Sequence, residues 1–495
     1  MHPIKKLAGE TVIYGLSSII GRLLNWLLVP LYVRLFVPEV YGIVTNMYAY
    51  VAFLIVILTY GMETGYFRYS NKDNDNKKVY TTALLSLFVT SFIFIFLCIN
   101  LADNIAVLIK YPKHSEYIVW LAVTVGIDAF SCIPFAKLRK ENRPVRFATI
   151  KFINIGLNIG FNLFFLILCR NIYTGNPNSV IKYIYSPEIG VGYVFISNLI
   201  ASAITLLLLS PDIFSYKIVF DFKIWKKMLV YSFPLLIVGI AGMTNQNIDK
   251  ILLRYLLPAA ANPMRQLGIY GANYKIAILM AMFIQAFRYS FEPFFFSYSD
   301  KTDSKKIYSQ IMKYFIIIGL IIFLGITLYI DIVKLFIKEN YYSGLRVVPI
   351  VLLAIFFQGI FYNLSLWYKL NDLTKYGAYL SIIGAIITIV INIVFIPEYG
   401  YMASAWAVLI CFVTMTVLSY FLGQKHYPVD YNIKSFFFYL ILALGIFFIN
   451  YNLEFSVLLN KLLFNTLLFF VFLIVVFVKE KPKNFISVIK DRFRK

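Results

Sequence analysis

Charged residues are scarce in this chain, and acidic residues are scarcer still. Of 495 residues 14% are charged, with 24 Asp or Glu against 46 Lys or Arg, and 60% are apolar. Soluble domains carry about 25% charged residues. Residues 84–101 and 379–396 are instead apolar runs as long as a membrane-spanning helix. The shortage excludes a soluble domain and predicts an all-α polytopic membrane protein.

Histidine and cysteine, which often serve as catalytic or metal-binding residues, are also few. The chain has three histidines and four cysteines, the latter all in or beside apolar runs: Cys98, Cys132, Cys169 and Cys411. None is spaced as a metal-ligand set, no nucleophile–base pair stands out, and no G-x-x-x-x-G-K-[ST] phosphate loop occurs. We therefore expect no catalytic residue, no metal and no cofactor, and we interpret the cysteines as packing residues.

The apolar runs predict fourteen transmembrane helices joined by short loops. They lie near residues 10–35, 41–65, 79–101, 117–136, 147–169, 190–210, 228–257, 267–290, 311–330, 347–368, 376–396, 402–422, 435–450 and 456–478.

The basic residues alternate from one side of these spans to the other. With the N-terminus in the cytoplasm, the cytoplasmic segments hold 30 Lys or Arg and the outward segments hold 10. Such a bias predicts that both termini are cytoplasmic. It also accounts for the net charge of +22 without a nucleic-acid partner, because these residues face the cytoplasm and the anionic lipid headgroups there.

Polar loops recur at a fixed interval along the chain. YSNKDNDNKKVY at 69–80 returns as YSDKTDSKKIY at 298–308, and VYG at 40–42 returns as IYG at 269–271, each 229 residues later. PEIGV at 187–191 returns as PEYGY at 397–401, only 210 later, because the first copy has the extra loop 171–185. This register indicates a tandem duplication.

Each copy contains six spans, an even number, so both copies have the same orientation in the membrane. The sequence therefore predicts two parallel six-helix repeats, 1–215 and 216–424. Residues 425–495 have no counterpart and form two additional C-terminal helices with a basic cytoplasmic tail.

Three cations lie deep within predicted spans. A charge at the middle of a bilayer costs about 2.5–3.5 kcal/mol, so it usually faces a cavity or a partner. Arg22 lies in span 1, Lys250 in span 7 and Lys275 in span 8, which include the first helices of both repeats. If these helices face each other, the cations line a central cavity suited to an anion such as phosphate.

Other polar residues in the spans have two interpretations each. Arg254 either joins this substrate-binding set or extends its side chain to the outer membrane surface. Asp249 and Asn247 either couple an ion to transport or serve a structural pair with Lys250. Asp128 in span 4 is either a proton site or a hydrogen-bonded packing residue.

Three stretches of the chain resemble a known family. PLYVRLFVPEVYGI (30–43), NIDKILLRYLL with LGIYGANYKIA (within 247–277), and PEYGYMASAWA (397–407) are similar to the polysaccharide flippases of the multidrug/oligosaccharidyl-lipid/polysaccharide (MOP) exporter superfamily. The resemblance covers essentially the whole chain and points to the Wzx-type O-antigen or capsule branch. The arginine-rich first spans of the peptidoglycan-precursor flippases are missing, since span 2 has no central cation.

The resemblance implies a transporter in the bacterial inner membrane. Its substrate would be a polyprenyl-pyrophosphate-linked oligosaccharide, moved to the outer leaflet for cell-surface polysaccharide or lipopolysaccharide biosynthesis. Two bundles would form a V-shaped cavity that opens alternately to each side, with Na+ or H+ as the coupling ion. Partners would be membrane lipids, the polysaccharide polymerase and the glycosyltransferases.

Two other classes remain as alternatives. A cation-coupled multidrug exporter of the same superfamily would need acidic cavity residues for organic cations, whereas this cavity is predicted to be cationic. A membrane glycosyltransferase or polymerase would need carboxylates in a large outward loop, and the longest here, 170–189, has only Glu188.

Overall fold

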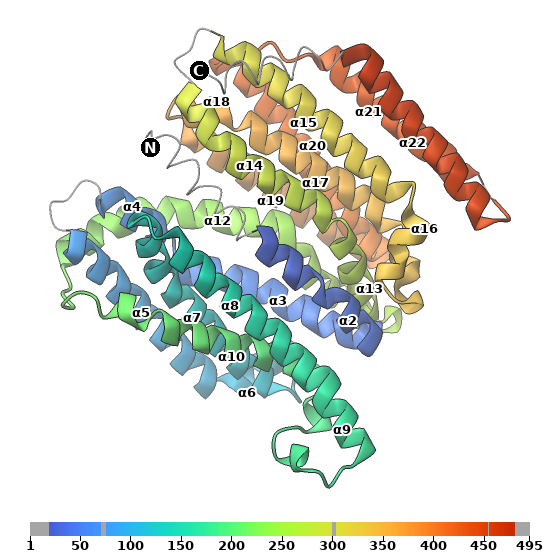
Figure 1. The fold of residues 1–495 in the computed structure, drawn as a ribbon. Coiled ribbons are helices and arrows are strands. Elements are labelled where there is room, and N and C mark those ends of the chain that lie inside the picture. Colours follow the sequence, from blue (N-terminus) through green and yellow to red (C-terminus); the bar gives the residue numbers. More distant parts are fainter. Residues whose placement is uncertain (1–18, 71–75, 299–302, 454, 481–495) are drawn as a thin grey trace.

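The computed structural model describes residues 19–70, 76–298, 303–453 and 455–480, and Figure 1 shows them as a helical assembly. No β-strand occurs in these ranges. Eleven of the described helices are long and apolar enough to cross a membrane, or twelve when the bent pair Pro263–Ile276 and Ile278–Tyr289 is one span. The apolar helix Gly192–Leu208 is shorter, and the helix at 19–35 continues a predicted span that begins outside the described residues. The prediction of a fourteen-span helical membrane protein agrees with this arrangement.

Helices of the first half pack on one another. Their bounds are α2 Leu28–Leu35, α3 Pro38–Thr59, α4 Met62–Ser70, α5 Asn76–Asn100, α6 Ala102–Leu108, α7 Ser115–Lys140, α8 Pro144–Leu163, α9 Arg170–Gly175, α10 Gly192–Leu208 and α11 Ser210–Ile213. Helix α7 packs against α3, α5, α8 and α10, and we call this group the first bundle.

Helices of the second half form another group around α17. Their bounds are α13 Pro263–Ile276, α14 Ile278–Tyr298, α15 Ser304–Thr327, α16 Ile330–Val333, α17 Val347–Leu364, α18 Leu366–Leu370, α19 Thr374–Tyr399 and α20 Tyr401–His426. Helix α17 packs against α13, α14, α15 and α20, and we call this group the second bundle. That the bundles coincide with the predicted divisions at 215/216 and 424/425 stays a prediction.

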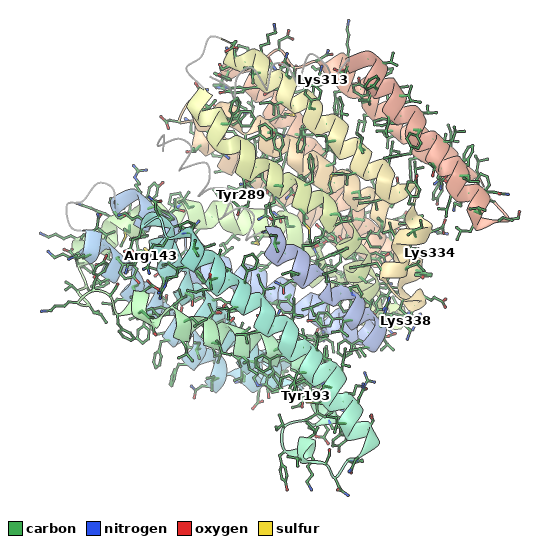
Figure 2. All side chains as sticks on the ribbon, viewed as in Figure 1. Arg143, Tyr193, Tyr289, Lys313, Lys334 and Lys338 are labelled. Carbon is green, nitrogen blue, oxygen red and sulfur yellow. The ribbon has the colours of Figure 1, made fainter. Side chains whose placement is uncertain are left out.

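The two ends of the assembly carry different loops. Figure 2 shows Arg143 and Lys313 at one end, and Lys334 and Lys338 at the other. The charge bias predicts that Arg143 and Lys313 face the cytoplasm, so we call theirs the inner end and the opposite one the outer end. Helix α9 and its loop project from the outer end of the first bundle (Figure 1).

Helix α12 (Phe222–Leu256) runs between the two bundles (Figure 1). Its inner half packs on α4 and α5, and Ser232 Oγ donates a hydrogen bond to the Gly61 carbonyl over 3.1 Å. Its outer half packs along α19, where Asn245 Nδ2 donates to the Ser381 carbonyl over 3.2 Å. Residues on the outer half of α12 therefore lie where both bundles can reach them.

At the outer end the bundles touch through glycines of α3 and α13, which we call the glycine seam. A Cβ atom on Gly42 would lie 2.2 Å from the Met264 carbonyl oxygen, and one on Gly268 would lie 1.8 Å from that of Pro38. A Cβ on Gly271 would lie 2.3 Å from Thr45 Oγ1. Only glycine allows the two backbones to approach so closely, as in other helix pairs within membranes.

Helices α21 (Ile433–Asn452) and α22 (Leu458–Glu480) dock on α15 of the second bundle. At one end Glu480 pairs with Lys313 and accepts a 2.7 Å hydrogen bond from the Tyr439 hydroxyl. At the other, Asn465 Nδ2 donates to the Leu328 carbonyl over 2.6 Å and Lys461 pairs with Asp331 over 2.8 Å. Polar contacts at both ends fix this helical pair to one bundle.

The connection between the bundles is anchored by Asp212, in the short helix α11. The buried Asp212 carboxylate accepts from Arg143 over 3.1 Å and from Arg146 over 2.7 Å. We expect Asp212→Ala to lower stability by about 1–3 kcal/mol, because it leaves two charged donors without their acceptor. Thermal unfolding of the purified protein measures this, and Glu188→Ala, which removes an exposed carboxylate, serves as the control. An unchanged melting temperature for Asp212→Ala would contradict the anchoring role.

Candidate functional site

The candidate site is centred on Asp249 and Lys250, in the outer half of α12. Asp249 is fully buried and Lys250 is 8% exposed. Lys250 Nζ lies 3.2 Å from Asp249 Oδ1 and donates to the Gln246 carbonyl over 2.7 Å. The Tyr270 hydroxyl donates to Asp249 Oδ2 over 2.6 Å. Both carboxylate oxygens of Asp249 are thus engaged, one by an ammonium group and one by a phenol.

Lys250 also faces aromatic rings and a second cation on α13. Its Nζ lies 4.4 Å from the ring centre of Tyr274, a distance typical of a cation–π contact. Lys275 is half-buried and lies within electrostatic range of Lys250. Trp26 of the first bundle donates a 2.7 Å hydrogen bond to the Lys275 carbonyl. Residues of both bundles therefore meet around these two lysines.

Arg22 approaches this region from the first bundle. Its side chain is exposed, and both Arg22 and Arg288 lie within electrostatic range of the Tyr362 hydroxyl on α17. The Arg288 guanidinium lies 4.5 Å from the centre of the Tyr362 ring. Tyr362 also forms a hydrogen bond with the side chain of Gln246, whose carbonyl accepts from Lys250. These contacts connect Arg22 and Arg288 with Lys250.

We call Arg22, Lys250, Lys275 and Arg288 the cationic cluster. In the described ranges, Asp249 is the only carboxylate that forms an ion pair with Arg22, Lys250 or Lys275, and Lys250 and Tyr270 already occupy it. The cluster thus has an excess of positive charge, and Arg22 is open to solvent. Such an arrangement can hold an anion with several oxygens, because guanidinium and ammonium groups donate multiple hydrogen bonds to it.

Arg254 lies apart from the cationic cluster, near the outer end. It is 9% exposed, its Nη2 donates to the Lys110 carbonyl, and its Cζ lies 3.6 Å from the Tyr111 ring centre. It therefore joins α12 to the α6–α7 connection of the first bundle. Substrate binding and contact with the outer membrane surface both remain predictions for Arg254.

Asp128 and Asn247 also lie apart. Asp128 is in the first bundle, hydrogen-bonded to Ser202 and within electrostatic range of Lys151. Asn247 Nδ2 lies 3.8 Å from Met243 Sδ, one turn earlier on the same helix. The structure thus brings Arg22, Lys250, Lys275 and Asp249 together, and leaves Arg254, Asp128 and Asn247 outside this group.

Sequence reasoning did not include Arg288 or the tyrosines of the site. Arg288 lies near the inner end of its predicted span, where a side chain that reaches the membrane surface is a sufficient explanation. Tyr270, Tyr274 and Tyr362 are three of 38 tyrosines, so composition does not distinguish them. The spacing Tyr270–Tyr274, one turn apart beside Lys275, was the available signal.

The fold is similar to that of solved transporters. Over 94% of this chain and 99% of that chain, it matches the structure titled "Lipid II flippase MurJ, inward closed conformation", with a TM-score of 0.72 and 15% identity. It also matches the inward-facing conformation of a multidrug resistance MATE family transporter of the MOP superfamily, with a TM-score of 0.64, 14% identity, and 84% and 94% of the two chains covered. This is the fold of the MOP transporters.

The sequence then gives the family. Residues 31–300 match the model of the family described as "Polysaccharide biosynthesis protein", and the chain belongs to it. No curated protein sequence matches the chain. The resemblance to polysaccharide exporters, based on three short motifs, is therefore confirmed at the level of the family, and the fold is that of the MOP transporters.

Proposed function

We propose that this protein moves a polyprenyl-pyrophosphate-linked oligosaccharide from the inner to the outer leaflet of the bacterial inner membrane. The observation that carries the proposal is the cationic cluster, to which both bundles contribute. Arg22 and Lys250 would hold the pyrophosphate between the bundles while the polyprenyl tail stays in lipid. The family description, polysaccharide biosynthesis, supports a sugar-linked cargo.

Alternating access is the proposed mechanism. The glycine seam closes the outer end, as expected of a state that receives cargo from the cytoplasm. In keeping with this, the chain matches the inward-facing MATE transporter with a TM-score of 0.64 and the outward-facing one with 0.58, at the same 14% identity. The bound anion would relieve repulsion within the cluster, allow the inner ends to approach, and so favour opening of the seam.

Coupling to Na+ or H+ is assigned to Asp249 in this proposal. It is a buried carboxylate whose partners, Lys250 and Tyr270, lie on two different helices of the site. Loss of its charge would release Lys250, so an ion at Asp249 and an anion at Lys250 would influence each other. Asp128, beside Ser202 and Lys151, is the second candidate.

A multidrug exporter remains the second function, because its relatives have the same fold. The charges argue against it, since an organic cation would meet Arg22, Lys250 and Lys275 around one occupied carboxylate. Transport without covalent chemistry is likewise part of the proposal, with the polymerase and glycosyltransferases of the pathway as partners.

The test of the function is deletion of the gene in a strain without a sister flippase. We expect polyprenyl-linked repeat units to accumulate on the cytoplasmic leaflet, which a membrane-impermeant sugar-modifying enzyme would detect after the cells are opened. Normal translocation in that strain would refute the proposal. Resistance to organic cations is measured in parallel, and a loss of resistance with normal polysaccharide would favour the exporter.

The proposed orientation has its own test. We expect a cysteine at Lys77 to react with thiol reagents from the cytoplasm and one at Asn176 to react from outside, because the charge bias assigns these loops to opposite sides. Accessibility to an impermeant reagent in intact cells and in inverted vesicles measures this. Equal reactivity from one side would overturn the topology.

A further inference from the structure

A pocket of about 730 Å³ lies at the outer end of the first bundle, away from the cationic cluster. We call it the outer arginine pocket, and its lining combines apolar and basic side chains: Leu31, Arg34, Leu35, Leu166, Ile167, Arg170, Asn171 and Thr174. Arg34 is in the last turn of α2, and Arg170 begins α9. Two helices far apart in sequence thus contribute one arginine each.

Both arginines are exposed and lack a counter-charge. Neither guanidinium lies within 4.0 Å of a carboxylate in the part of the chain that the structure describes. Three other outer-end cations do have such a partner: Lys334 and Lys461 pair with Asp331, and Arg265 with Glu39 over 3.7 Å. Two guanidinium groups that face one pocket repel each other, and an anion between them would remove that repulsion.

The rest of the lining matches a lipid rather than a free anion. Leucine and isoleucine side chains form one part of the pocket, while arginine, asparagine and threonine form the other. Ile167 and Leu168 beside it are exposed, as expected for residues that face the bilayer. Because the predicted spans 1 and 5 end near residues 35 and 169, the basic part of the pocket would be at headgroup level and its apolar part at tail level.

Two local features, a π-helical turn and the extra loop, belong to this pocket in the first copy of the repeat. Residues Phe164–Cys169 form a π-helical turn, whose extra residue rotates all that follows by about 100° and so directs Arg170. Asn171 and Thr174 belong to the extra loop, which has no equivalent in the second copy.

The second copy uses the corresponding arginine differently. Arg34 lies four residues before Pro38 in RLFVP, and Arg254 four residues before Pro258 in RYLLP, so each arginine is near the end of the first helix of its copy, 220 residues apart. Arg254 is buried against Lys110 and Tyr111, whereas Arg34 opens into the pocket. The repeat alone therefore does not explain why Arg34 is exposed in a pocket.

We propose that the outer arginine pocket binds the phosphate headgroup of a lipid in the outer leaflet. Arg34 and Arg170 hold the phosphate oxygens, Asn171 and Thr174 supply neutral donors, and Leu31, Leu35, Leu166 and Ile167 contact the first part of the tail. The inference rests on the membrane placement of the pocket and does not require the proposed cargo. Two lipids have this chemistry: an anionic glycerophospholipid and a polyprenyl pyrophosphate.

The experiment uses the full chain in phosphatidylcholine nanodiscs, with phosphatidylglycerol and undecaprenyl pyrophosphate as separate probes. Arg34→Ala/Arg170→Ala is expected to weaken binding of at least one probe by about tenfold or more, since two charge-assisted contacts are lost. Arg34→Lys/Arg170→Lys should retain part of the binding. Arg346→Ala removes another exposed arginine from the outer end of the second bundle and should leave binding unchanged.

Each outcome has a defined meaning. A loss confined to phosphatidylglycerol identifies a site for a bilayer lipid, and a loss confined to undecaprenyl pyrophosphate identifies one for the released cargo. Equal binding of both probes by wild-type and double variant overturns the site. Lys250→Ala distinguishes the pocket from the proposed transport site. This variant should impair transport and leave the binding of phosphatidylglycerol to the pocket intact. Should the double variant be unstable, Arg170→Gln alone gives the same comparison.

Discussion

Replacing Arg22 or Lys250 with alanine is expected to abolish transport and to leave the protein in the membrane at wild-type level. Each side chain would donate charge-assisted hydrogen bonds to the anionic headgroup, and each such bond is worth about 1.5–3 kcal/mol, or roughly tenfold or more in affinity. Arg22 is exposed between the bundles, so its removal should cost little stability. The measurements are surface polysaccharide and the leaflet distribution of lipid-linked oligosaccharide.

Further variants separate charge from geometry. Arg22→Lys should retain part of the activity if positive charge alone is sufficient, and little if the planar guanidinium is required. Lys182→Ala, which removes an exposed cation on the extra loop, is the control and should transport normally. Full activity of the Arg22→Ala and Lys250→Ala variants would end the hypothesis of a headgroup site.

Asp249→Asn distinguishes the two roles of the carboxylate. Asn keeps the hydrogen bond from Tyr270 and removes the ion pair with Lys250. If only Lys250→Ala and Asp249→Asn abolish transport while Arg22→Ala is active, the pair serves structure or ion coupling. If all three fail, the cluster acts as a unit on the anion.

Gly268→Ala is expected to open the outer end of the transporter. The new methyl group would lie 1.8 Å from the Pro38 carbonyl oxygen, which belongs to the backbone and cannot move aside like a flexible side chain. Overpacking of this kind costs about 1–3 kcal/mol. Because the closed seam bears that cost and an open one does not, the population should shift toward the open state.

Distances between spin labels at Val37 and Ala260, on either side of the seam, measure this shift. The distribution should lengthen in Gly268→Ala, and transport should fall. Gly325→Ala is the matched control, because nothing lies within 4 Å of a Cβ at that position. An unchanged distribution in Gly268→Ala would mean that the seam does not hold the outer end closed.

Local signals made the fold predictable from sequence. Apolar runs and alternating Lys and Arg located the spans, because the bilayer sets both the length of a helix and the side of its loops. The breaks differ in this respect: Pro30 lies three residues after the turn at Leu27 and is a signal for it, whereas the 46° bend at Ala277 has no such signal. No Pro or Gly lies within three residues of Ala277, so local propensity does not reveal this bend.

The candidate site was predictable where burial of charge is costly. Lys250 and Lys275 lie at mid-span, where no interpretation avoids a partner or a cavity. Arg254 was ambiguous because its acceptor, the Lys110 carbonyl, lies 144 residues away and is a backbone atom that no composition reveals. Arg288 was missed because its depth in the membrane allowed a simpler explanation.

The glycine seam bears on how such a chain could arise. The predicted duplication makes Gly42 of VYG and Gly271 of IYG equivalent residues, and each faces the opposite half of the chain. A surface that meets its own counterpart across a twofold axis is the mark of a symmetric homodimer interface. The hypothesis that follows is a six-span ancestor that paired through this tripeptide before the genes fused. In this hypothesis, fusion lets the halves diverge, one with the outer arginine pocket and the other with two more helices.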